Sequence, residues 1–135
     1  MNRNDFKRLA GLRLAESRRL LDSGHHEGAF YLAGYAVECV LKACYASKTK
    51  RFDFPPEQGE YRKAYSHELS DLATIAGVRG DLEQAGTKTA ANWNIVRRWS
   101  HLSRYGFFAK KDAEELISVI ADRTHGVLAC IRKHW

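Results

Sequence analysis

The sequence predicts an all-α fold, an antiparallel bundle of four main helices plus a short helix. Apolar residues recur at helical spacing along most of the chain, and no segment alternates apolar and polar residues for long enough to form a strand. The two prolines are adjacent, at Pro55 and Pro56, so helices elsewhere need not accommodate one. A length of 135 residues suits one domain with its own core. We therefore expect a single helical domain over residues 1–135.

Turn and cap residues divide this domain into its expected elements. Asn4 or Asp5 can cap the first helix, and Gly24 can end it. Ser66 is a plausible cap for the short third helix, and Gly106 is placed to end the fourth. The expected helices span residues 4–22, 27–47, 66–76, 90–105 and 110–133, with one long polar loop over about 48–64.

Composition narrows the classes of protein without naming one. The chain is 44% hydrophobic and 28% charged, which is typical of a globular protein, and its net charge of +6 permits an anionic partner without requiring one. No apolar run approaches the roughly 20 residues of a membrane span, and the N-terminus lacks the apolar core of a secretory signal. Cys39, Cys44 and Cys130 lie in apolar helical patterns and are interpreted as reduced core residues of a cytoplasmic protein.

The predicted fourth helix carries the candidate site. At about 100° per residue, a continuous helix over 90–105 has one aromatic and aliphatic face and one face of mixed basic and aromatic residues. The second face holds Trp93, Arg97, His101 and Arg104, flanked by Arg98 and Tyr105.

Two interpretations of that face are open. It is either a solvated surface or an anion site, in which guanidinium groups hold phosphates and Trp93 and Tyr105 stack on bases. In a catalytic version of the anion site, His101 moves a proton and Arg97 stabilises the charge that develops on phosphorus.

Three other polar features were considered alongside this face. Glu38 and Lys42 are one helical turn apart and can form a surface ion pair, or, if they face inward, can orient Arg97 or His101. His67 is interpreted as a local cap or packing residue. The adjacent histidines at 25–26 have no third ligand spaced to join them, so we expect no metal and no cofactor.

Several segments together resemble one family. Residues 20–43 combine a leucine-rich helix end, a glycine turn and a helix that contains Ala33-Gly34, Glu38 and Leu41-Lys42-Ala43. His67-Glu68-Leu69 and the stretch from Trp93 to Arg104-Tyr105 follow in a matching order. Over roughly residues 5–130 the chain resembles the HEPN domain (higher eukaryotes and prokaryotes nucleotide-binding).

The resemblance implies an all-α bundle that dimerises around a cleft. Many members of the family are ribonuclease toxins or defence effectors with an Arg, four to six residues, then His, and some pair with a nucleotidyltransferase antitoxin that modifies a tyrosine two residues after the histidine. Here Arg97 and His101 are separated by three residues, and Ser103 occupies the tyrosine position.

Two hypotheses follow from the residues and the resemblance. The first is a module that binds nucleotide, RNA or a partner protein through the basic face that includes Arg98 and Arg104. The alternative is a metal-independent ribonuclease that uses Arg97 and His101, with Glu38 and Lys42 in support. A homodimer and a nucleotidyltransferase partner protein are the partners that the resemblance implies.

Overall fold

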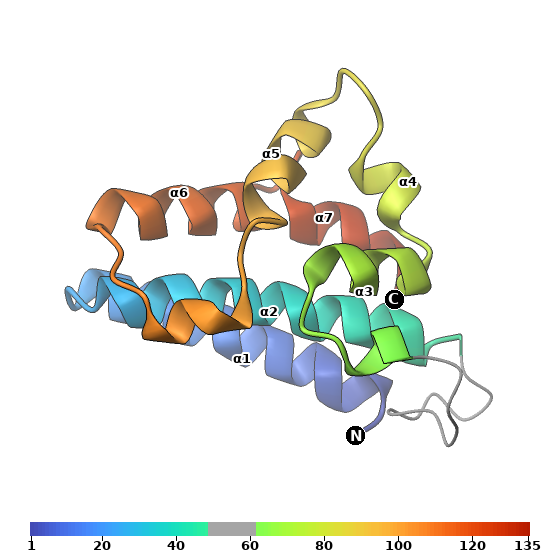
Figure 1. Ribbon diagram of the computed structural model, residues 1–135, viewed down its shortest axis with the longest axis horizontal. Coiled ribbons are helices and arrows are strands. Elements are labelled where there is room, and N and C mark those ends of the chain that lie inside the picture. The colour runs from blue at the N-terminus through green and yellow to red at the C-terminus, as the bar shows by residue number, and fades with distance from the viewer. Residues whose placement is uncertain (49–61) are drawn as a thin grey trace.

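The computed structural model describes residues 1–48 and 62–135, so most of the predicted loop lies outside the described residues. The all-α prediction is confirmed, and there is no β-strand among the described residues (Figure 1). The helices are α1 (Arg3–Asp22), α2 (His26–Ala46), α3 (Leu69–Ala76), α4 (Arg79–Leu82), α5 (Lys88–Val96), α6 (Lys110–Ala121) and α7 (Val127–Ile131). Three 3₁₀ helices accompany them: η1 (Arg62–Tyr65), η2 (His101–Tyr105) and η3 (Arg132–His134).

Helix α2 is the centre of the molecule. It runs beside α1 as the second arm of a helical hairpin and also contacts α3, α6, α7 and η2 (Figure 1). Every residue from 36 to 46 is buried, which is possible because alanine, valine and cysteine dominate this stretch. Small side chains let neighbouring helices approach α2 from several sides.

The N-cap of the first helix lies two residues before Asn4, the first of the two predicted caps. Asn2 is the N-cap, and its side-chain oxygen accepts from the Asp5 amide at 3.1 Å while the Asp5 carboxylate accepts from the Asn2 amide at 2.9 Å. This reciprocal pair is a capping box, so Asp5 contributes from inside the helix. After the C-cap, Gly24 adopts a positive φ of 82°, a conformation that favours glycine.

The third helix begins later than predicted. Glu68 is its N-cap, and Leu69 is its first residue. Ser66 does not cap the helix, because its hydroxyl instead accepts from the Glu68 amide at 2.9 Å in the turn before the helix. This turn leaves His67 on the surface just ahead of α3.

The predicted continuous helix over 90–105 was wrong. Helix α5 ends at Val96, and η2 begins after Ser100, which caps it. Trp93 and Trp99 are both buried, with exposed fractions of 0% and 2%. In one continuous helix these side chains would point about 120° apart. The break at 97–100 lets both indole rings reach the core.

The predicted helix over 110–133 is also interrupted. Helix α6 ends at Ala121, and the carboxylate of Asp122 accepts from the amides of Thr124 and His125 at 3.2 and 2.7 Å. A Cβ atom on Gly126 would lie 2.2 Å from the backbone oxygen of Asp122, so this tight joint requires glycine. Helix α7 then continues beyond the joint (Figure 1).

Candidate functional site

The segment after α5 lies against α2 because two aromatic rings anchor it. The indole of Trp99 lies directly over Gly34, where a Cβ atom would be 2.3 Å from three ring atoms. The Tyr31 ring stacks beside this indole with a centroid separation of 5.9 Å. At the other end of the segment, the rings of Phe108 and Phe30 stack at 3.9 Å. These contacts place η2 alongside α2.

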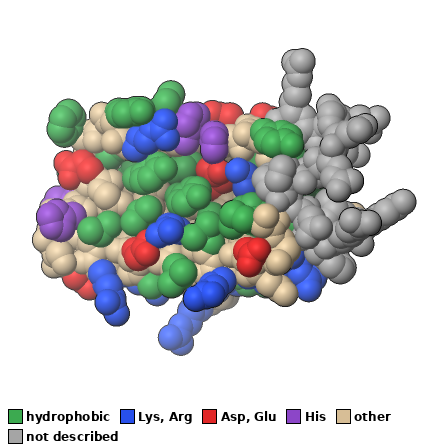
Figure 2. Space-filling model, turned by 90° about the horizontal axis from the view of Figure 1, so that it is seen from below, with side chains coloured by type: hydrophobic (Ala, Val, Ile, Leu, Met, Phe, Trp, Pro, Cys, Tyr) green, Lys and Arg blue, Asp and Glu red, His purple; other side chains and the backbone are tan. Residues whose placement is uncertain are grey.

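Two histidines from distant parts of the sequence meet at this position. His101 is the first residue of η2, and His67 lies in the turn before α3. Their ring centroids are 4.7 Å apart with an interplanar angle of 40°. His67 is about half exposed and His101 is partly buried. Figure 2 shows one face of the molecule, on which histidine side chains lie near a group of hydrophobic side chains.

A buried carboxylate supports the histidine pair. Glu38 is 1% exposed, and its Oε1 atom accepts from Lys42 Nζ at 2.7 Å and from His67 Nδ1 at 2.9 Å. The expectation of a surface Glu38–Lys42 pair was wrong, because both residues are buried in α2. Their inward orientation positions His67, rather than Arg97 or His101.

The hydrogen bond to Glu38 also fixes the chemistry of the His67 ring. An ionised carboxylate has no hydrogen to donate, so Nδ1 of His67 carries the hydrogen of this bond. In the neutral imidazole, Nε2 is then the nitrogen with a free lone pair. In its neutral form, His67 is therefore oriented with Nε2 as its proton acceptor, at a half-exposed position. The sequence interpretation of His67 as a cap or packing residue missed this contact, which joins two separate elements.

The structure brings together only part of the basic and aromatic face that was predicted on a helix over residues 90–105. Trp93 is fully buried, with its Nε1 donating to Glu83 at 3.4 Å, so it is not available to stack on a base. Arg97 is the exposed C-cap of α5, and among the described residues no hydrogen bond or ion pair joins it to His101. Arg98 instead lines a separate hollow of about 350 Å³ beside Phe108.

Arg104 and Tyr105 lie on the same 3₁₀ helix as His101. The Arg104 guanidinium lies 4.9 Å from the centroid of the Tyr105 ring, and both side chains are exposed. In a 3₁₀ helix the side chains at positions i and i+3 eclipse each other, so His101 and Arg104 share one side of η2. Arg104, rather than Arg97, therefore lies on the same side of its helix as His101.

The cysteines are neutral thiols. Burial raises the pKa of Cys39 to about 12, with the nearby Glu38 carboxylate acting in the same direction. Burial likewise raises the pKa of Cys44 to about 11, and it also raises that of Cys130. A protonated thiol is a poor nucleophile, so the candidate chemistry rests on the histidines.

Residues 1–48 and 62–135 contain neither a cluster of metal ligands nor a membrane-spanning helix. No group of three or more His, Cys, Asp or Glu side chains there could hold a metal ion. None of the helices in residues 1–48 and 62–135 is long and apolar enough to cross a membrane.

The fold and the site together define an all-α module with a paired-histidine surface beside an exposed arginine. The HEPN domain family model matches residues 4–124, and the chain therefore belongs to the HEPN family. This membership supports a nucleotide-binding or ribonuclease-like module, and HEPN domains often dimerise. The comparison with curated proteins found no match, and neither did the comparison with solved structures.

Proposed function

We propose that this HEPN domain binds single-stranded RNA at the surface formed by His67, His101, Arg104 and Tyr105. The observation that carries the proposal is the His67–His101 ring pair, held from behind by the buried Glu38 carboxylate. Besides pairing with the buried Lys42, the Glu38 carboxylate orients a half-exposed imidazole, which the ion pair by itself does not require. The net charge of +6 favours a polyanionic partner.

Each residue of this surface suits a different part of a single strand. Tyr105 is 72% exposed and offers a flat ring on which an unpaired base can stack. The Arg104 guanidinium can donate to a phosphate through two parallel N–H groups. The imidazoles add donors and acceptors for phosphate or ribose oxygens. Single strands suit this surface best because their bases are free to leave the stack.

Anisotropy of a fluorescently labelled RNA oligomer tests the binding proposal. His101→Ala and Arg104→Ala are expected to weaken binding by about tenfold or more, because stacking and charged hydrogen bonds each contribute about 1–3 kcal/mol. Arg79→Ala is the charge-matched control, because Arg79 lies on α4 and pairs with Glu83. If the control weakens binding as much as the two site variants do, the affinity comes from overall charge and the proposed surface is wrong.

A second function, metal-independent RNA cleavage, is favoured by the same pair of imidazoles. Nε2 of His67 would remove the proton of a ribose 2′-hydroxyl, whose oxygen then attacks the adjacent phosphorus. Protonated His101 would donate its proton to the 5′-oxygen as the bond from phosphorus to that oxygen breaks. Arg104 would stabilise the charge on the phosphorane. The products would be a 2′,3′-cyclic phosphate and a free 5′-hydroxyl.

Incubation of total RNA in EDTA distinguishes the two functions. If the unmodified protein cleaves RNA and both His67→Ala and His101→Ala lose the activity, the protein is a ribonuclease that uses this site. The rate of cleavage would then follow a bell-shaped pH profile. Intact RNA in all three reactions, with binding retained by the unmodified protein, would restrict the site to binding. Cleavage that survives both substitutions would place the activity elsewhere or in a contaminant.

The same surface is our candidate for self-association. Leu102 and Phe107 flank the site and are 57% and 94% exposed, an unusual exposure for apolar side chains of this size. A homodimer that buries them would bring two copies of the site onto one shared face. Sedimentation at tens of micromolar is expected to show a dimer, and Phe107→Glu is expected to shift it to monomer. A monomer in the unmodified protein would contradict this part of the proposal.

A further inference from the structure

A second group of basic side chains lies away from the histidines. It surrounds a hollow of about 510 Å³ between α1 and the joint that connects α6 to α7. None of the residues that line this hollow belongs to the His67–His101 site. Its volume lies within the range of about 300–1,000 Å³ that is usual for small-molecule sites.

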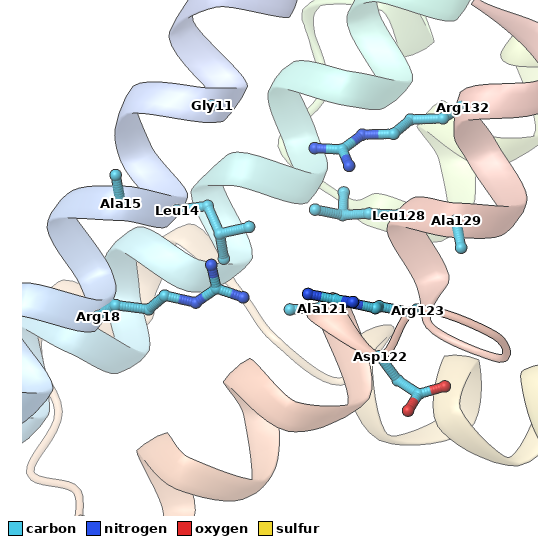
Figure 3. A pocket seen from close by; sticks show the side chains of 10 residues that line it. All are labelled: Gly11, Leu14, Ala15, Arg18, Ala121, Asp122, Arg123, Leu128, Ala129 and Arg132. Atoms are coloured by element: carbon cyan, nitrogen blue, oxygen red, sulfur yellow. The ribbon is translucent and has the colours of Figure 1, made fainter.

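Three arginines from three elements converge on this hollow. Arg18 comes from the last turns of α1, Arg123 from the joint after α6, and Arg132 from the start of η3. Figure 3 shows the guanidinium groups of Arg18 and Arg123 pointing toward each other, with the Leu14 and Leu128 side chains between them and the Arg132 guanidinium. An apolar floor lowers the local dielectric constant and strengthens the attraction of the arginines for an anion.

Within residues 1–48 and 62–135, no carboxylate pairs with the positive charge at this place. Among the described residues no ion pair involves Arg18, Arg123 or Arg132. The one acidic side chain at the rim, that of Asp122, points away from the arginines (Figure 3). Its carboxylate is engaged by the amides of the joint, chiefly that of His125, and these hydrogen bonds lower the pKa of Asp122.

The three arginines line the same hollow although their charges repel. Arg132 lies over the Trp135 ring, with 5.4 Å from the guanidinium carbon to the ring centroid, and this contact leaves its charge intact. Arg123 lies in the tight joint before Gly126, where a Cβ atom on the glycine would meet the backbone of Asp122. Part of the geometry is thus already formed before any anion arrives, which reduces the entropy lost on binding.

We propose that this hollow binds a compact polyphosphate, the phosphate chain of a di- or triphosphate, either free or carried by a nucleotide. Three guanidinium groups can each donate two parallel hydrogen bonds to phosphate oxygens. A chain of two or three phosphates carries several negative charges and so balances three arginines, which one phosphate group does less well. The volume of the hollow favours a small ligand over a folded macromolecule.

Calorimetric titration of the full chain with inorganic triphosphate tests the proposal. Arg18→Ala, Arg123→Ala and Arg132→Ala are each expected to raise the dissociation constant by about tenfold or more. Arg19→Ala is the matched control, because it removes the same charge from the neighbouring position of α1 and does not line the hollow. All four arginines are exposed, so the variants are expected to fold. An equal loss in the Arg19→Ala control, or no binding by the unmodified protein, would overturn the proposal.

Titration with ATP tests whether the phosphate chain is free or part of a nucleotide. The His101→Ala variant tests whether this site is distinct from the proposed RNA surface. ATP that binds as tightly as inorganic triphosphate supports recognition of the chain alone, and tighter ATP binding supports a nucleotide ligand. His101→Ala is expected to bind triphosphate as the unmodified protein does. If His101→Ala abolishes triphosphate binding, or if inorganic phosphate binds as tightly as triphosphate, the proposed site is wrong.

Discussion

The contact between Gly34 and Trp99 positions η2, and replacing Gly34 with alanine tests it. Within a helix this substitution normally stabilises, because alanine is favoured over glycine by about 0.8–1.0 kcal/mol. Here the new Cβ atom would lie 2.3 Å from three atoms of the Trp99 indole. The ring must therefore move away from α2, and the His67–His101 contact would be lost with it.

The expected change in the free energy of unfolding for Gly34→Ala is the sum of two opposing effects, overpacking and helix propensity. Overpacking of a buried site costs about 1–3 kcal/mol, which offsets or exceeds the gain in helix propensity. Gly11 supplies the control, because it lies within α1 and a Cβ atom there would meet nothing within 4 Å. We expect Gly11→Ala to raise the free energy of unfolding by about 1 kcal/mol. Gly34→Ala is expected to fall about 1–3 kcal/mol below that control.

Urea unfolding followed by tryptophan fluorescence measures both changes. A third variant, Gly34→Ala combined with Trp99→Ala, removes the clash. In the Trp99→Ala background, Gly34→Ala should recover the gain of about 1 kcal/mol expected from helix propensity. If Gly34→Ala stabilises the unmodified protein as much as Gly11→Ala does, the ring does not depend on the glycine, and our account of how η2 is placed fails.

Three other predictions concern stability and reactivity. Glu38→Ala leaves the Lys42 ammonium buried without its carboxylate and is expected to lower the free energy of unfolding by about 3–5 kcal/mol. The exposed-pair control Glu114→Ala should change it by less than about 1 kcal/mol in urea unfolding. Burial raises the pKa of Cys39 from 9.0 to about 12. Between these two pH values the thiol stays protonated in the folded chain but loses its proton in the unfolded chain. The stability contributed by this thiol is therefore expected to decline as the pH rises through that range, and a thiol reagent should label Cys39 only after unfolding. Gly126→Ala places a Cβ atom 2.2 Å from a backbone oxygen, so calorimetry should show a melting temperature several degrees lower.

Much of the fold was predictable because local pattern and tertiary packing agree there. The long helices α1 and α2 begin and end within one residue of the predicted bounds. Their apolar stripes are wide, and Gly24 marks the turn between them with a positive φ. The signals that ended these helices are local, so sequence reasoning could use them.

The interruption after α5 could not be predicted in the same way. No proline or glycine occurs between Lys88 and Tyr105, so helix propensity favours one continuous helix. The break arises because Trp93 and Trp99 both become buried, and only the tertiary structure shows where each ring goes. The one available signal was Gly34, a glycine in a buried helix that implies the close approach of a large group.

The candidate site was predicted incompletely for the same reason. His101 and Arg104 keep a common side of η2, but the helical arithmetic also grouped them with Trp93 and Arg97 on a helix that does not exist. The contact with His67 joins segments far apart in sequence, and no periodicity can reveal such a contact. Only the inward alternative for Glu38 pointed toward the arrangement that is present.

The central claim is that His67 and His101 act on RNA as one site. A double-mutant cycle on RNA affinity tests it directly, with His67→Ala, His101→Ala and the double variant measured beside the unmodified protein. Adjacent groups that act together are expected to show a coupling free energy of at least about 0.5 kcal/mol. The fold loss of RNA affinity in the double variant should therefore be smaller than the product of the fold losses in the two single variants. Losses that multiply independently, or unchanged affinity in both single variants, would contradict the claim.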